Sequence, residues 1–277
     1  MQLLHRVPRR RLNAALGHRL DFYSAFPKSA SRHLVALLTR VSGGRVNVVR
    51  GKTAGGAGNN LLDRRRILGD LRVGRHTLVY GHFPCSRYNL DVMRRCSATP
   101  RVLVSIRPLA DVVVSYKEHV DRLGRGPLDP GLPGRAEGLA TWQALSDVER
   151  YEHVIDTTLP WYLQHVAGWL AAPPDIPVLW LRFEQITGDG LQVVQDVDRF
   201  LGYGMDRAVL RTRFAEARDQ RSNFNQALAG RGAHLLGAAQ LRRLHELSGR
   251  FAADLSPELR AYLAPSPPVA AVRGLGR

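Results

Sequence analysis

Hydrophobic and polar positions follow two different patterns along this chain. Short apolar runs rich in β-branched and aromatic residues occur at 21–26, 46–49, 77–81, 101–106 and 177–182. Runs of this length and composition predict strands. Longer stretches with helical spacing separate them, near 30–42, 61–70, 87–97, 109–121, 136–171, 188–202, 206–218 and 238–250. The pattern therefore predicts strands that alternate with helices.

This alternation is typical of an α/β fold, and we expect a single domain with a central, mostly parallel sheet flanked by helices. In such sheets the ligand-binding loops lie at the carboxyl ends of the strands. The domain is predicted to span residues 1–264, and residues 265–277, rich in Pro, Ala and Gly, to form a flexible tail. The Gly- and Pro-rich segment 122–135 predicts a surface loop.

The residues that follow the first predicted strand are the first candidate for chemistry. Pro27-Lys28-Ser29-Ala30-Ser31 stands between that strand and a predicted helix. A turn of this kind directs backbone N–H groups and the positive end of the helix dipole at one point, which suits a phosphate. Lys28 would add a charge, and Ser29 and Ser31 would add hydroxyl donors. Alternatively, Pro27 only ends the strand and one of the serines caps the helix.

A second candidate group lies in RVLVSIRPLADVVVSYKEHV, residues 101–120, which predicts a strand followed by a helix. Arg107 ends the strand, and Ser115 follows eight positions later, about two helical turns on. A guanidinium and a hydroxyl that converge at the ligand edge of the sheet would hold a second phosphate group. Alternatively, Arg107 pairs with Asp111 and Ser115 is a small buried helix residue.

Composition limits the classes of partner. The formal net charge of +16 favours an anionic partner. However, the basic residues are scattered and aromatic residues make up only 7% of the chain, so nucleic acid is not expected. No apolar run is long enough to cross a bilayer. Cys85 and Cys96 fit a reducing compartment and lack the spacing of a metal site, so we expect a cytoplasmic protein without a metal.

One phosphate-binding motif is incomplete. Gly51-Lys52-Thr53 resembles the end of a Walker sequence, but Val46 stands where the first glycine of that sequence belongs. The residues AGGAGNN follow where a helix should begin. We therefore interpret Lys52 as a loop lysine.

Together, the two candidate segments resemble the sulfotransferases that use 3′-phosphoadenosine 5′-phosphosulfate (PAPS). PKSASRH at 27–33 is similar to their phosphosulfate loop PKSGTTW, and the spacing of Arg107 and Ser115 is similar to that of their 3′-phosphate motif. VLWLRFEQI at 178–186 resembles the family's VLYLRYEDL, and RFLGYGMD at 199–206 resembles its FLG turn. The four segments occur in the family's order.

This resemblance implies a P-loop NTPase-like fold that transfers the sulfuryl group of PAPS to a hydroxyl or amine, leaving 3′-phosphoadenosine 5′-phosphate (PAP). Lys28 would stabilise the bridging oxygen of the leaving phosphate. His82, in YGHFP after the third strand, matches a histidine that acts as the base in many members, or else fills a loop corner. Because some glycan-modifying relatives use a carboxylate, Glu118 and Asp121 stay open as alternatives.

Several implied cofactor contacts depart from the family pattern. Ala30 replaces a loop glycine and fits only if its φ is not positive. Arg32 replaces a threonine and would add charge at the phosphosulfate, and His33 replaces a tryptophan that packs on the adenine. Phe214, in the segment TRF, matches an aromatic residue that takes the other face of the adenine, or it is an ordinary core residue.

The late RKGxxGxW motif of the family is the poorest match. The residues NQA at 225–227 stand where its Arg-Lys-Gly should be, and Gly230 stands at its second glycine. The 3′-phosphate would thereby lose an expected cationic clamp. Arg221 or Arg231 could replace it, and we favour Arg231.

Other functions stay open beside this one. A P-loop-type small-molecule kinase needs a complete Walker motif and a carboxylate at a strand end, and neither is clear here. A basic nucleic-acid-binding protein, or a degenerate sulfotransferase fold kept for binding, would show salt-sensitive binding to duplexes. For a sulfotransferase, loops 51–60, 84–90 and 122–140 would form the acceptor pocket. Their arginines favour an anionic or sugar-like acceptor, either a small molecule or a glycan.

Overall fold

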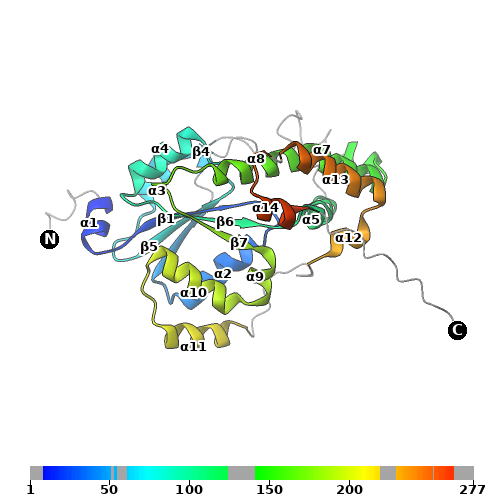
Figure 1. Ribbon diagram of the computed structural model, residues 1–277. Coiled ribbons are helices and arrows are strands. Elements are labelled where there is room, and N and C mark those ends of the chain that lie inside the picture. The colour runs from blue at the N-terminus through cyan, green and yellow to red at the C-terminus, as the bar shows by residue number, and fades with distance from the viewer. Residues whose placement is uncertain are drawn as a thin grey trace. The chain divides into compact units, whose positions relative to one another are not determined.

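The computed structural model describes residues 9–50, 53–54, 61–123, 141–218, 229–251 and 253–264. Five strands form one sheet in the order β2-β5-β1-β6-β7, and each neighbouring pair is parallel (Figure 1). They are β1 (Leu20–Ala25), β2 (Val46–Arg50), β5 (His76–Gly81), β6 (Val102–Ile106) and β7 (Val178–Arg182). All five predicted strands are confirmed, with ends that shift by no more than one residue, and so is the α/β class.

Helices follow the strands where helical spacing predicts them. They are α2 (Ser31–Val41), α3 (Arg64–Gly69), α4 (Arg87–Cys96), α5 (Leu109–Leu123), α7 (Asp147–Thr157), α8 (Leu159–Leu170), α10 (Gly190–Leu201), α11 (Arg207–Arg218) and α13 (Ala238–Arg250). Short helices are added at α1 (Arg9–Ala15), α9 (Phe183–Gly188), α12 (Arg231–Leu235) and α14 (Pro257–Leu263). In addition, β3 (Thr53–Ala54) and β4 (Leu61–Leu62) form a separate antiparallel pair.

Two of the predicted helical stretches are wrong in their extent. The longest one is divided, because the side chain of Ser146 caps α7 by accepting the backbone N–H of Glu149, and α8 starts anew after α7 ends. The stretch at 61–70 begins as a strand, and Asp63 then caps α3 by accepting the backbone N–H of Arg66. Capping side chains thus set boundaries that hydrophobic spacing alone does not show.

The chain divides into two compact units. The first takes its described residues from Met1–Ile106 and Gly168–Ala227 and contains the whole five-stranded sheet. Within it, α2, α10 and α11 lie on one side of the sheet, and α3 and α4 lie on the other (Figure 1). The second unit takes its described residues from Arg107–Ala167 and Leu228–Arg277, and they are mainly helical. One domain over residues 1–264 stays a prediction, and the tail at 265–277 lies outside the described residues.

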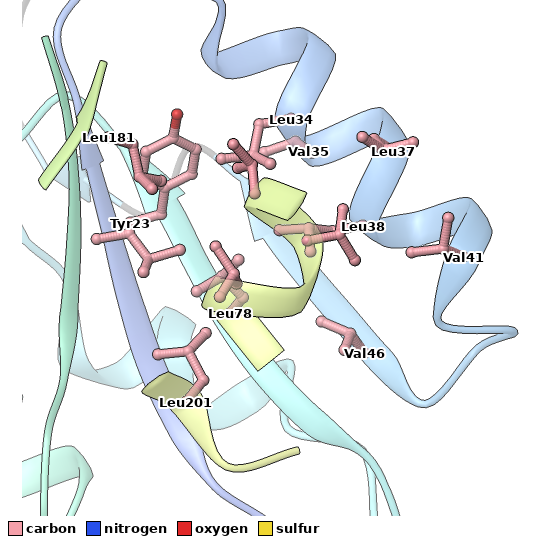
Figure 2. Packing of buried hydrophobic residues seen from close by; sticks show 14 of the residues in the cluster. Tyr23, Leu34, Val35, Leu37, Leu38, Val41, Val46, Leu78, Leu181 and Leu201 are labelled. Atoms are coloured by element: carbon pink, nitrogen blue, oxygen red, sulfur yellow. The ribbon is translucent and has the colours of Figure 1, made fainter. Parts of the chain in front are cut away.

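A hydrophobic cluster in the first unit positions α2 against the sheet (Figure 2). Leu34, Leu38 and Val41 recur along one face of α2 at helical spacing, and each is no more than 1% exposed. They belong to one cluster with Tyr23 of β1 and Leu78 of β5, both fully buried. Burial of a side chain of this size stabilises the fold by about 1.5–3 kcal/mol. The cluster therefore holds the end of β1 and the start of α2 in a defined relation.

Two further predictions concern the surroundings of the protein. No helix in the described ranges is long and apolar enough to cross a membrane. Cys85 and Cys96 are both free thiols. The cytoplasmic location stays a prediction.

A buried carboxyl group lies near the amino end of β1. Asp21 is fully buried. This burial raises the pKa of Asp21 from 3.8 to about 7, although the positive charges of Arg101 and Arg19 oppose the shift. The protonated acid is therefore the favoured form in the folded protein at mildly acidic pH.

We expect Asp21→Asn to stabilise the fold at pH 8 far more than at pH 5. Because the folded pKa is raised, the contribution of Asp21 to stability is present below 3.8 and is lost as the pH rises through about 7. Asparagine does not ionise, so its advantage in unfolding free energy should grow by about 1.4 kcal/mol per pH unit in this window. Urea unfolding of both proteins at the two pH values measures the effect. If the difference in unfolding free energy between the two proteins does not change with pH, the pKa of Asp21 is not raised by burial.

Candidate active site

The order of the strands changes direction at β1. From β1 the chain continues to β2 and β5 on one side of that strand, and then to β6 and β7 on its other side. In open parallel sheets, ligands bind at such a switch point, outside the carboxyl ends of the strands. The loop after β1, with Lys28, and the loop after β5, with His82, both lie at this edge.

The loop between β1 and α2 passes through two left-handed residues. Lys28 has a φ of 73° and Ala30 a φ of 62°. Among the described residues, no other residue except glycine has a positive φ. The expectation that Ala30 avoids positive φ is therefore wrong. The turn imposes on alanine a conformation that glycine adopts without steric cost. Backbone strain of this kind clusters at functional sites.

Ala30→Gly is expected to raise the unfolding free energy by up to about 1.6 kcal/mol. Glycine avoids a steric cost of about 1–2 kcal/mol at this φ, and its greater freedom in the unfolded chain offsets roughly 0.4–1 kcal/mol of the gain. Urea unfolding measures the change. Ala36→Gly, in the middle of α2, is the matched control and should destabilise by about 0.5–1 kcal/mol. A loss of stability in Ala30→Gly would show that its left-handed backbone is not strained.

Buried hydroxyl groups hold this loop to the sheet. Ser29 is fully buried, and its hydroxyl donates to the carbonyl oxygen of Phe26 at 2.6 Å. The same hydroxyl lies 2.6 Å from that of Ser105 on β6, to which Tyr23 donates at 3.0 Å. The Ser29 side chain therefore fixes the loop from within the protein.

A second hydroxyl pair joins the first turn of α2 to β5. The hydroxyl of Ser31 lies 2.9 Å from that of Tyr80, and both residues are buried. Burial raises the pKa of Tyr80, so its phenol stays protonated. Tyr80 and Ser105 were not predicted from the sequence. Both are polar residues near the end of a buried strand, and buried polar groups need hydrogen-bond partners. This feature of the sequence could have identified them.

The start of α2 is an anion-binding feature. A helix leaves its first backbone N–H groups without intrahelical partners, and together they carry about half a positive charge. No side chain caps α2 at Ala30, and its first turn contains no acidic residue. Lys28 is half-buried just before this turn, and Arg32 is exposed within it. This arrangement suits a phosphate or phosphosulfate group.

The two rings assigned to the adenine differ in their surroundings. His33 is half-buried in the first turn of α2, and burial, together with the charge of Arg40, lowers its pKa. Its imidazole is therefore a neutral ring near pH 7. Phe214 on α11 packs against the hydrophobic cluster, where a Cβ on Gly190 would lie 3.2 Å from its ring. The structure thus places Phe214 in contact with the core.

His82 is held in one tautomer. Its Nδ1 lies 2.6 Å from the carbonyl oxygen of Ala25, the last residue of β1. Because a carbonyl oxygen only accepts, Nδ1 donates and Nε2 is the basic nitrogen. Burial lowers the pKa of His82 and outweighs the opposing effect of this hydrogen bond. A neutral imidazole with a defined basic nitrogen is the state that a general base requires.

Arg107 is the first residue of the second unit and directly follows β6 in the chain. It is buried, and its backbone N–H donates to the Tyr162 hydroxyl at 2.7 Å. The same hydroxyl donates to the Arg107 carbonyl oxygen at 2.8 Å. The Arg107 Nε lies 3.8 Å from Asp111, and Ser115 is also buried. Asp111 and Ser115 are four residues apart on α5, so they lie on the same face of that helix.

Asp111 also holds the late segment that contains Gly230. Its carboxylate accepts the backbone N–H groups of Gly230 at 2.8 Å and of Gly232 at 2.7 Å. A Cβ on Gly232 would lie 2.2 Å from the backbone carbon of Ala110, so only glycine fits at this position. From the sequence, Asp111 is expected only as a partner of Arg107. In the sequence, the glycines on either side of Arg231 are the feature that could have predicted this close packing.

The other predicted residues of the second unit take part in ion pairs. Arg231 binds the Glu118 carboxylate through both terminal nitrogens, one of them at 3.1 Å. These hydrogen bonds lower the pKa of Glu118. Asp121 lies 3.1 Å from the Lys117 ammonium nitrogen. With its lowered pKa, the Glu118 carboxylate is a weak proton acceptor and suits the role of base less well than His82.

Some predicted features lie outside the described residues. They are Lys52, Arg221, the segment 225–227, most of the loop 51–60, and nearly all of the loop 122–140. The loop 84–90 is described, and within it Ser86 caps α4 by accepting the backbone N–H of Asn89 at 3.3 Å.

Residues 79–243, more than half of the chain, match the family described as sulfotransferase domain. Among solved structures, the fold is similar to that of a mouse sulfotransferase complexed with PAP. The TM-score is 0.58 at 15% identity, covering 91% of this chain and 92% of that one. It is also similar to retinol dehydratase in complex with androsterone and inactive cofactor PAP. Here the TM-score is 0.55 at 14% identity, covering 86% and 83% of the two chains. No curated protein matches the sequence.

Proposed function

Because the chain belongs to the sulfotransferase domain family, we propose that it transfers the sulfuryl group of PAPS to a hydroxyl or amine of a small-molecule or glycan acceptor. The observation that carries the use of PAPS is the loop before α2. It combines the half-buried Lys28 with an uncapped helix start and the exposed Arg32, which fits a phosphosulfate group. When bound, PAPS supplies the activated sulfuryl group.

Lys28 acts where negative charge develops during the transfer. The acceptor oxygen forms a bond to sulfur as the bond between sulfur and the bridging oxygen of the leaving phosphate breaks. That oxygen gains charge in the transition state, so an ammonium beside it lowers the barrier more than it tightens binding. A lysine on a flexible stem can follow this charge, whereas arginine presents a fixed planar fork. This accounts for a lysine in a chain whose 40 cationic residues are almost all arginine.

His82 takes the proton that the acceptor hydroxyl releases. The proton goes to Nε2, because Nδ1 already donates to the carbonyl oxygen of Ala25. The resulting imidazolium strengthens that hydrogen bond, since a charged donor binds a carbonyl more strongly than a neutral one. Ala25 directly precedes the loop of Lys28 in the chain, so the base and the loop share one strand end as an anchor.

For the 3′-phosphate we assign Arg107, Ser115 and Arg231. Arg107 pairs with Asp111, which is one helical turn before Ser115 on α5. The carboxylate of Asp111 also fixes the segment of Arg231 to α5. Arg231 is engaged with Glu118, so a phosphate that binds it must compete with this ion pair. The cationic clamp therefore differs from the RKG motif of the family.

Arg107→Ala is expected to weaken PAP binding by about tenfold or more, with a smaller effect on kcat at saturating PAPS. A hydrogen bond to a charged group contributes about 1.5–3 kcal/mol, and the 3′-phosphate remains bound throughout the transfer. Calorimetric titration with PAP measures the affinity. Arg243→Ala, which removes an exposed arginine paired with Asp156, is the control and should bind PAP normally. Wild-type affinity in a folded Arg107→Ala protein would remove Arg107 from the cofactor site.

Calorimetric titration with PAP, AMP and ATP tests the proposed function. Tight binding that requires the 3′-phosphate, followed by release of PAP from PAPS when an acceptor is added, supports it. A preference for ATP would favour a small-molecule kinase instead. Absence of nucleotide binding together with salt-sensitive binding to a duplex would favour a nucleic-acid-binding protein.

A further inference from the structure

A polar groove follows the free edge of the sheet in the first unit. β2 is an edge strand, and in the described sheet it pairs with β5 alone. A cavity of about 410 Å³ lies along residues 47–50 of this strand and residues 69–72; we call it the β2 groove. Its volume is in the range of sites for small ligands. The free edge of β2 presents backbone N–H and C=O groups, which are partners for hydroxyl and amide groups.

The β2 groove has an excess of positive charge. Arg50 and Arg72 line it, and Asp70 is the acidic residue among its described lining residues. The side chain of Asn47 donates to the backbone carbonyl oxygen of Asp70 at 3.1 Å. This hydrogen bond joins the two segments that line the groove. Both arginines are exposed, and no carboxylate within the described ranges forms an ion pair with either of them. Two such guanidinium groups fit an anionic ligand.

Arg50 also connects the β2 groove with the base. Its guanidinium carbon lies 6.0 Å from the centre of the Tyr80 ring. The Tyr80 ring lies 6.0 Å from the His82 ring, edge to face. Three neighbouring side chains therefore lead from the groove to the histidine, all within one unit.

We propose that the β2 groove binds an acidic saccharide as the acceptor, with Arg50 on its anionic group. The free edge of β2 and the Asn47 side chain face its hydroxyl groups, and another hydroxyl of the same molecule reaches His82. This inference rests on the proposed function, because it assigns the acceptor of the same site. The excess of positive charge over the whole chain favours the approach of such a molecule.

Two model acceptors that differ in one group test this assignment. 4-Nitrophenyl β-D-glucuronide has a carboxylate where 4-nitrophenyl β-D-glucoside has a neutral hydroxymethyl group. Calorimetry with and without PAP should show that the wild type binds the glucuronide at least about tenfold more tightly. Arg50→Gln should lose this preference, and Arg72→Gln should reduce it. Arg199→Gln, on α10 outside the groove, is the matched control and should keep it.

Equal affinity of the wild type for the two glycosides, or a preference that survives in Arg50→Gln, overturns the proposal. Self-association that Arg50→Gln abolishes would assign the edge of β2 to a second copy of the chain and would also overturn it. The affinity for PAP is measured separately for each variant. If neither the wild type nor any variant binds PAP, the use of PAPS is refuted. The affinities for the two glycosides measured without PAP still show whether the β2 groove binds an acidic saccharide.

Discussion

Lys28→Ala is expected to lower kcat by at least about 100-fold while it changes the affinity for PAP by less than about tenfold. In the proposed reaction, the ammonium of Lys28 acts on a charge that develops only as the sulfuryl group leaves. In the same proposal, PAP binding keeps the contacts of the α2 N-terminus and of the 3′-phosphate. Turnover with PAPS under saturating conditions and calorimetry with PAP measure the two quantities separately. Unchanged turnover in this variant would remove Lys28 from the reaction.

The backbone at Lys28 provides a control for strain. Lys28 has a φ of 73°, and alanine has the same steric cost there, so Lys28→Ala should change the unfolding free energy by less than about 0.5 kcal/mol. Lys28→Gly should unfold at higher denaturant and yet be equally inactive. A Lys28→Gly protein with restored turnover would show that the conformation of the loop, and not the ammonium, limits the reaction.

His82→Ala is expected to lower kcat by about 100-fold or more with binding of PAP retained, because a positioned base contributes about 10²–10⁴ to the rate. The pH profile of the wild type gives an independent check. The base works in its deprotonated form, and burial lowers the pKa of His82 below 6.5. Activity should therefore be flat near pH 7 and fall only as the pH drops through this lowered pKa. In His82→Ala this fall of activity at low pH, the acid limb of the profile, should be absent.

His245→Ala, which removes an exposed histidine on α13, is the matched control and should keep both the rate and the acid limb. Circular dichroism at each pH separates loss of catalysis from loss of the fold. Should His82→Ala remain fully active, the base would be a carboxylate. The variants Glu118→Gln and Asp121→Asn would then identify it.

Features that depend on neighbours in the sequence were predicted well. The five strands are short apolar runs, and each ends within one residue of its predicted position. The turn of Lys28 and the eight-residue spacing from Arg107 to Ser115 follow from the elements on either side. Helix boundaries were predicted less well, because a single capping side chain such as Ser146 divides a stretch whose hydrophobic spacing is continuous.

The state of each site residue depends on partners that are far away in the chain. The proton on His82 is fixed by Ala25, 57 residues earlier, and the Ser29 hydroxyl is turned inward by Ser105, 76 residues later. The left-handed backbone of Ala30 follows from closing the loop between two packed elements. By itself, the sequence determined the order of strands and helices and the residue types at the strand ends, because local spacing sets both. Tertiary structure alone decided the protonation, conformation and partners of those residues, because burial and hydrogen bonding arise only when distant segments pack together.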